Sequence, residues 1–186
     1  MHIEVSNGTT TSIGTGFLFL NDSQSNTNLD NRYLVTNRHL VTPYDTGTIT
    51  FIPGTPSKPV FGEPLYAIFT DWRTRWITHP DTNIDVAIMP WPRAIFLKSS
   101  SKNLPKDKDG NFVVANLPIG RALCMTQTNM QYLASSEQIM FIGYPADFYD
   151  KAHTLPIARH GFTASPIALD FMGQRSDRRA SCRERV

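Results

Sequence analysis

Cysteine is nearly absent from this chain. Its 186 residues include two cysteines, Cys124 and Cys182, and the second lies in an arginine-rich segment at the end. A single thiol in the rest of the chain cannot form an internal disulfide, which is typical of a reducing compartment. The first residues, Met1–Val5, also lack the basic start and apolar block of a secretory signal. We therefore expect a cytoplasmic protein, with Cys124 as a small core residue rather than a nucleophile.

The sequence also has no long hydrophobic run and little net charge. No apolar stretch approaches the roughly 20 residues that a membrane-spanning helix needs. The formal charge of +2 arises from residues 175–186, which hold five arginines, one aspartate and one glutamate. Without them, 13 basic and 14 acidic residues remain, a net charge of −1. This composition gives no electrostatic basis for binding nucleic acid or an anionic membrane, so we expect neither partner.

Residues 175–186 differ from everything before them. Strand-like apolar runs stop at Phe171-Met172, and an arginine-rich string without any periodic pattern follows. The last seven residues, ASCRERV, resemble one translated reading frame of a common sequencing adapter. We interpret the segment as a non-native tail and exclude it from fold reasoning; a natural basic tail is the alternative. On the first interpretation, the gene was cut near residue 174 and the natural protein continues.

Short apolar runs between turn-forming residues predict an all-β fold. No segment shows a long helical period of 3.6, which favours an antiparallel barrel or sandwich. Residues 93–120 interrupt the pattern with polar loops and suggest a boundary. We expect a β-barrel over residues 1–125 and the start of a second over 126–174, which is too short to close. The runs that predict strands are 17–20, 33–36, 46–52, 65–70, 86–89, 138–142 and 155–163.

A histidine and an aspartate each stand at the end of such a run. His39 follows Tyr33–Thr36, and Asp85 precedes Val86–Met89. Histidine can take up and return a proton near neutral pH, because its ordinary pKa is about 6.5. As a general base it needs a buried carboxylate that fixes its tautomer and stabilises the imidazolium. Asp85 suits this role better than Asp81, which we expect in an exposed turn. Taken alone, however, each is as consistent with a surface residue or a turn former.

The segments around these two residues resemble a known family. Leu34-Val35-Thr36-Asn37-Arg38-His39-Leu40-Val41 is similar to the strand-then-histidine motif of trypsin-like serine peptidases with the chymotrypsin fold. Asn83-Ile84-Asp85-Val86-Ala87-Ile88 is similar to their aspartate motif, and its distance of 46 residues from the histidine fits the first barrel of that family. The resemblance implies that His39 is the general base and that Asp85 orients it.

The resemblance extends over roughly residues 1–174. Gly14-Thr15-Gly16-Phe17 looks like the early strand of the first barrel. Ile142-Gly143-Tyr144-Pro145 and the segment 159–166 look like second-barrel strands of the disulfide-free bacterial or phage branch. It implies a chymotrypsin-like double antiparallel β-barrel whose first barrel is complete and whose second is not. It also implies a polypeptide substrate, hydrolysis through a serine ester, and no cofactor or metal.

The nucleophile that this family requires is missing from the sequence. No Gly-x-Ser-Gly segment is present, and Ser165 precedes a proline without supporting glycines. Ser135 and Ser136 have no supporting pattern either. Removal of a triad nucleophile costs several orders of magnitude in rate. We therefore interpret the chain as the N-terminal portion of a serine endopeptidase and predict that it is inactive by itself.

Other signals in the sequence are weaker. A non-catalytic β-barrel binding module of the same fold is the alternative to the enzyme. Gly14-x-Gly16 lacks the third glycine and the helix of a nucleotide-binding loop, and the histidines lack metal-ligand spacing. We expect the three tryptophans in the core or at a barrel rim rather than stacked on bases; they are Trp72, Trp76 and Trp91. The sequence leaves substrate preference and oligomeric state open.

Overall fold

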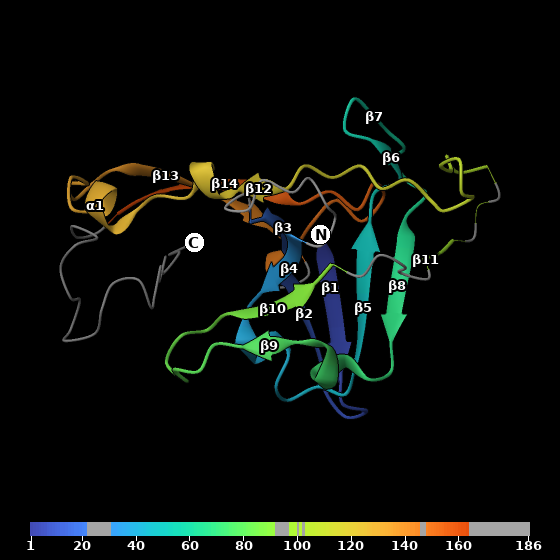
Figure 1. Cartoon of the computed structure of the whole chain (residues 1–186), viewed down its shortest axis with the longest axis horizontal. Helices are drawn as coiled ribbons and strands as arrows, with labels where there is room; N and C mark the ends of the chain where they lie inside the picture. The colour runs from blue at the N-terminus through green and yellow to red at the C-terminus, as the bar shows by residue number, and fades with distance from the viewer. Residues whose placement is uncertain (22–30, 92–96, 100, 102, 146–147, 164–186) are drawn as a thin grey trace.

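Strands dominate the computed structural model (Figure 1), which describes residues 1–21, 31–91, 97–99, 101, 103–145 and 148–163. Helical structure in these ranges is limited to short turns. They are the 3-10 helices η2 (Arg38–Leu40), η3 (Trp72–Arg75) and η4 (Arg121–Leu123), and the α-helix α1 (Gln127–Met130). None of the helices in the described ranges has the length and apolar character needed to cross a membrane.

The first sheet has five antiparallel strands in the order β11-β8-β5-β1-β2. Side chains alternate between its two faces, as the period of a strand requires. Ile3 and Val5 are buried while Glu4 between them is exposed. The strands are β1 (His2–Ser6), β2 (Thr11–Thr15), β5 (Thr46–Phe51), β8 (Leu65–Phe69) and β11 (Leu97–Lys98). A small hairpin of β6 (Gly54–Thr55) and β7 (Lys58–Pro59) follows β5.

The second sheet has the order β12-β3-β4-β10-β9. Its neighbours pair antiparallel, except that β12 runs parallel to β3. The strands are β3 (Phe17–Leu20), β4 (Arg32–Thr36), β9 (Ile77–Thr78), β10 (Ala87–Pro90) and β12 (Ile119–Gly120). The pairing of β4 with β10 matters most for the site, because it brings the end of β4 and the start of β10, which are far apart in sequence, next to each other at one end of the sheet.

The chain passes from the first sheet to the second at Gly16, between β2 and β3. A Cβ atom there would lie 2.7 Å from Ile3 Cδ1 and 3.3 Å from the carbonyl oxygen of Val35, so a side chain does not fit. Strands that bend at such corners let two sheets pack face to face. The buried side chains form one cluster, to which the first sheet contributes Ile3, Val5, Ile49, Phe51, Leu65, Ala67 and Phe69, and the second Leu18, Leu34, Ala87 and Met89.

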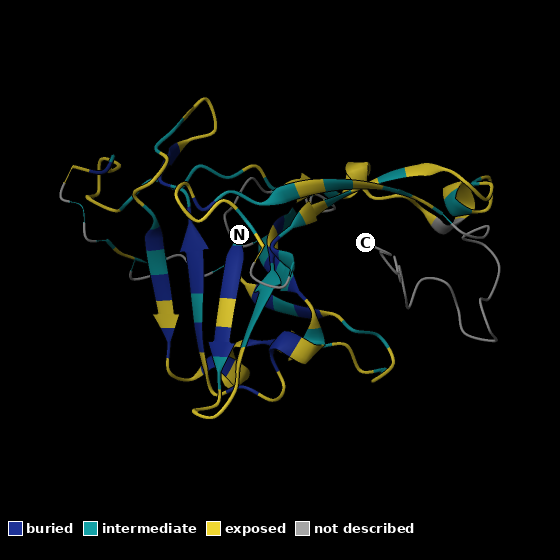
Figure 2. Ribbon diagram, turned by 180° about the vertical axis from the view of Figure 1, so that it is seen from behind, coloured by how far each residue is buried: buried dark blue, intermediate teal, exposed yellow. Residues whose placement is uncertain are grey.

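Strands β13 (Gln138–Gly143) and β14 (Ile157–Phe162) form a separate antiparallel pair. No residue of the two strands is buried, and their ribbon in Figure 2 carries only the intermediate and exposed colours. The pair is attached to the first sheet where β13 ends. The backbone N–H of Tyr144 donates to Thr15 Oγ1 at 2.9 Å, and a Cβ at Gly143 would lie 2.6 Å from that oxygen.

The expectation of an all-β fold is confirmed at the level of a mostly β structure with largely antiparallel sheets. Every run that predicted a strand overlaps one, whereas β1, β2 and the two-residue strands β6, β7, β9, β11 and β12 have no counterpart among the runs. A closed barrel is not found among the described strands, which form two five-stranded sheets in linear order and two two-stranded pairs. The boundary near residue 125 stays a prediction. Residues 164–186, with Ser165 and the tail, lie outside the described residues.

The prediction for Cys124 is wrong. Its side chain is exposed, and its Sγ lies 3.9 Å from the carbonyl oxygen of Gly120. It directly follows η4 and belongs to neither large sheet, so the short apolar run around it has no core to enter. The prediction for the tryptophans is confirmed. Trp72 and Trp76 are buried in the core cluster, and Trp91 packs against it.

Candidate functional site

His39 reaches the surface because β4 ends three residues before it. Leu34 and Thr36 of β4 are buried, and Thr36 Oγ1 donates to the carbonyl oxygen of Thr15 at 2.9 Å. This bond ties the last residue of β4 to β2. The chain then leaves the sheet at Asn37 and turns through η2, which exposes His39 and buries Leu40.

Asp85 arrives at the same edge from the other direction. The turn before it is closed by Asp81, whose Oδ1 accepts hydrogen bonds from the backbone and side chain of Asn83. Strand β10 then begins at Ala87, which pairs with Thr36 at the end of β4. In an antiparallel pair, one strand ends where its neighbour begins. The residues that follow β4 therefore lie beside the residues that precede β10.

The two side chains meet across this edge. His39 Nδ1 lies 2.6 Å from Asp85 Oδ2, and the backbone N–H of His39 donates to Asp85 Oδ1 at 2.9 Å. Asn37 Nδ2 donates to Asp85 Oδ2 and to its carbonyl oxygen, both at 3.2 Å. The carboxylate is therefore held at both oxygens. Of the two aspartates weighed from the sequence, Asp85 pairs with His39, while Asp81 closes its own turn.

These contacts set the charge of Asp85. Burial raises its pKa, but the backbone N–H and imidazole of His39, and the amide of Asn37, together lower it below the ordinary value of 3.8. An ionised carboxylate can only accept hydrogen bonds, so Nδ1 of a neutral His39 carries the ring proton. The lone pair is then on Nε2, which makes no hydrogen bond within the described part of the chain. That is the tautomer of a general base.

The pair is more exposed than the sequence analysis expected. The side chain of His39 is 65% exposed and that of Asp85 is 42% exposed. The expectation of a buried carboxylate is therefore met only in part. Exposed ion pairs contribute about 0–1 kcal/mol to stability, so the stability of the fold does not explain the geometry.

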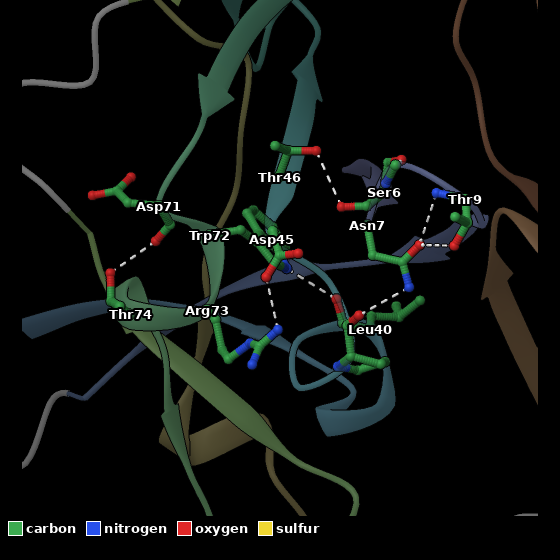
Figure 3. Close-up of polar contacts among 12 residues, drawn as sticks. Ser6, Asn7, Thr9, Leu40, Asp45, Thr46, Asp71, Trp72, Arg73 and Thr74 are labelled. Atoms are coloured by element: carbon green, nitrogen blue, oxygen red, sulfur yellow. Dashed lines mark hydrogen bonds and ion pairs between the residues drawn. The ribbon is translucent and has the colours of Figure 1, made fainter.

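The loop that carries His39 is anchored from below, by residues that the sequence analysis missed as part of the site. The buried indole of Trp72 donates from Nε1 to the carbonyl oxygen of Leu40 at 2.9 Å (Figure 3). The side chain of Leu40 packs over Gly14, where a Cβ would lie 2.0 Å from Leu40 Cδ1. Gly47 leaves room for the indole in the same way, since its Cβ would lie 2.2 Å from the ring. Asn37 is the other residue of the site that the sequence analysis missed. The available signal was its position directly after β4 and two residues before His39.

A second histidine–aspartate pair lies far from the first along the chain. His153 Nδ1 is 2.7 Å from Asp150 Oδ2, and Asp150 Oδ1 accepts from the backbone N–H groups of Ala152 and His153. The two side chains are three residues apart and belong to one turn. The sequence analysis did not select this pair, although the Asp-x-x-His spacing was visible.

A cavity of about 370 Å³ lies on the face of the first sheet opposite the core. Neither His39 nor Asp85 lines it. Its walls are His2, Glu4, Thr50, Gly62, Pro64, Tyr66, Tyr149, Lys151, Ala152 and Thr154.

Comparison of the chain with protein-family models, curated proteins and solved structures finds no match in any of the three. The geometry of the site is therefore the basis for its function.

Ser135 and Ser136, also considered from the sequence, are exposed before β13. The backbone N–H of Ser136 donates to the carbonyl oxygen of Thr163, and no hydrogen bond joins either serine to His39 in the described part of the chain.

Proposed function

We propose that this chain is the N-terminal portion of a trypsin-like serine endopeptidase, with His39 as general base and Asp85 as the residue that orients it. One observation carries the proposal: Asp85 holds Nδ1 of His39 at 2.6 Å, while Nε2 has no hydrogen-bond partner among the described residues and the side chain is 65% exposed. The corner at Gly16 and the two packed sheets support a first barrel of the chymotrypsin type. The β13–β14 pair supports the beginning of a second.

The chemistry follows from the tautomer. With the proton on Nδ1, the lone pair of Nε2 takes the proton of a serine hydroxyl as the oxygen attacks the carbonyl carbon of a peptide bond. The resulting imidazolium is stabilised by the carboxylate of Asp85, and it returns its proton to the leaving amine. Water then repeats the sequence on the serine ester. We assign the serine and the oxyanion hole to the continuation of the natural protein beyond residue 174.

A test of this proposal begins with the source DNA. Reading the frame past codon 174 is expected to show a Gly-x-Ser-Gly segment within about the next 20 residues. The extended protein is expected to react covalently with a fluorophosphonate probe, and His39→Ala to abolish the reaction. His153→Ala is the matched control, because that imidazole is also held through Nδ1 by an aspartate. Labelling that survives His39→Ala would refute the role of His39.

The 186-residue chain itself provides the complementary prediction. Without a nucleophile and an oxyanion hole, we expect no peptide cleavage above background, since each loss removes several kcal/mol of transition-state stabilisation, on the order of 3 for one oxyanion-hole donor. Cleavage of a fluorogenic peptide by this chain, abolished by His39→Ala, would show that the nucleophile lies within it.

A non-catalytic β-rich binding module is the second candidate. The exposure of the pair and the absence of a hydroxyl on Nε2 in the described residues favour it. The two candidates differ in one observable. A complete gene with no Gly-x-Ser-Gly segment supports the binding module.

A further inference from the structure

Of the two buried tryptophans, Trp72 and Trp76, only Trp72 donates its indole N–H to the loop of His39. From this geometry we propose that Trp72 is a positioning residue for His39 and acts through the carbonyl oxygen of Leu40. The inference rests on the proposed role of His39 as a base. It adds a residue that has no counterpart among the motifs from which that role was predicted.

The indole is itself held in place. Trp72 has no exposed surface, and its backbone N–H donates to the carbonyl oxygen of Asp45 at 3.0 Å. Asp45 in turn accepts from Arg73 Nη2 at 2.7 Å (Figure 3), and its backbone N–H donates to the carbonyl oxygen of Ser6. The donor is thus fixed against β1 and the start of β5.

The acceptor is the carbonyl oxygen of Leu40, the residue that directly follows His39 in the chain. Within η2, the N–H of Leu40 donates to Asn37 and the N–H of Val41 donates to Arg38, which closes a single tight turn. A 3-10 turn this short has weak internal bonds and relies on outside contacts. His39 lies between two anchors: Asn37 and Asp85 on one side, and the carbonyl of Leu40 on the other. Removal of the indole N–H leaves the anchor at Leu40 with only the packing of its side chain against Gly14.

Trp76 is a natural control for this proposal. Its ring lies 5.0 Å from that of Trp72, and its side chain is buried in the same cluster. Its Nε1 is also buried, but it has no hydrogen-bond partner in the part of the chain that the structure describes. Substitution of either tryptophan by phenylalanine removes the same atoms from one cluster. Only Trp72→Phe removes a bond to the loop of His39.

The test uses the intact chain with ¹⁵N-labelled histidine. In the unaltered protein at neutral pH, we expect His39 in the Nδ1–H tautomer with a slowly exchanging, downfield-shifted Nδ1 proton. Trp72→Phe is expected to raise the solvent exchange rate of that proton about tenfold, the factor that one net hydrogen bond implies. Trp76→Phe is expected to change it less than about twofold. Equal effects of the two substitutions would overturn the proposal, because packing alone would then explain them.

A second variant covers the case in which Trp72→Phe does not fold. Site-specific benzothienylalanine at position 72 replaces the N–H by sulfur and keeps the ring, so the packing stays and the bond is lost. It is expected to raise the exchange rate like Trp72→Phe, and an unchanged rate contradicts the proposal. Failure of the proposed function looks different. In that case the unaltered protein itself lacks the Nδ1–H tautomer, or Asp85→Asn does not alter it.

Discussion

The two histidine–aspartate pairs of this molecule have nearly the same local geometry and opposite origins. In both, an aspartate Oδ2 lies against Nδ1 of the histidine, at 2.6 Å for His39 and 2.7 Å for His153. In both, the other carboxylate oxygen accepts the backbone N–H of the same histidine. The pair of His153 and Asp150 spans three residues, whereas that of His39 and Asp85 spans 46.

This difference shows what each pair requires. A turn of four residues brings Asp150 to His153 by itself, and an aspartate that bonds the backbone two and three residues on is a common way to close such a turn. Asp85 reaches His39 only when β4 and β10 are paired and the core is formed. The local pair therefore has an explanation in turn formation, while the distant pair has none in local structure.

The largest effect is expected from breaking the scaffold of the distant pair alone. A Cβ at Gly47 would lie 2.2 Å from the ring of Trp72, which is buried and cannot move aside. We expect Gly47→Ala to lower the free energy of unfolding by about 2–3 kcal/mol, as overpacking of a core does. We also expect it to disturb the tautomer signal of His39 and to leave that of His153 unchanged. Urea denaturation and histidine NMR measure the two effects.

Gly8→Ala controls for the loss of a glycine as such. A Cβ at Gly8 meets nothing within 4 Å, although its φ of +88° makes a side chain unfavourable. We expect a cost of about 1 kcal/mol from backbone strain and no change at either histidine. If Gly47→Ala is no more costly than Gly8→Ala, the close packing around Trp72 is not what supports the site.

A smaller effect on stability, with a clear spectroscopic signature, is expected from removing either carboxylate charge. Asp85→Asn is expected to shift His39 away from the Nδ1–H tautomer, because a neutral amide no longer favours a donor at that position. It leaves His153 unchanged. Asp150→Asn is expected to do the reverse. Long-range ¹H–¹⁵N correlation spectra distinguish the tautomers, and a response of both histidines to either substitution would show that the pairs are coupled.

The sequence allowed His39 and Asp85 to be paired because both stand at ends of apolar runs. Short apolar runs located β4 and β10, and the resemblance of the segments beside them to the trypsin-like motifs selected the two residues. Antiparallel pairing of the two strands then determines which ends meet. The anchors behind the pair could not be predicted in this way. The bond from Trp72 to Leu40 joins residues 32 apart, and it depends on how a corner of the first sheet packs against η2. No period or spacing encodes that approach.

The misses have physical causes as well. Strand β1 has only two alternating buried apolar side chains, Ile3 and Val5, and its place inside the first sheet comes from pairing with β2 and β5. Cys124 lies in a run that is apolar enough for a core, but the run overlaps the exposed turn η4, and the side chain of Cys124 stays at the surface. Burial is a property of the neighbours that a residue acquires on folding, and a short run does not specify them.

The smallest expected effect is a loss of stability in acid that depends on Asp85. Its pKa is lowered in the folded protein, because the bonds from His39 and Asn37 outweigh burial. A carboxyl group of this kind stabilises the fold above its ordinary pKa of 3.8, and this contribution disappears as the pH falls through the folded value. Since the pair is exposed, the contribution is below about 1 kcal/mol. Urea denaturation of the unaltered protein and of Asp85→Asn is expected to show a difference in the free energy of unfolding at pH 5 that vanishes toward pH 2.

The pKa of Asp150 is lowered as well, chiefly by the hydrogen bond from the side chain of His153. Asp150→Asn is therefore expected to lower the free energy of unfolding at pH 5 and to lose this effect in acid. A difference for Asp85→Asn that grows from pH 5 to pH 2 would mean that the carboxylate is not held as the geometry indicates, and the distant pair would lose its claim to a fixed tautomer.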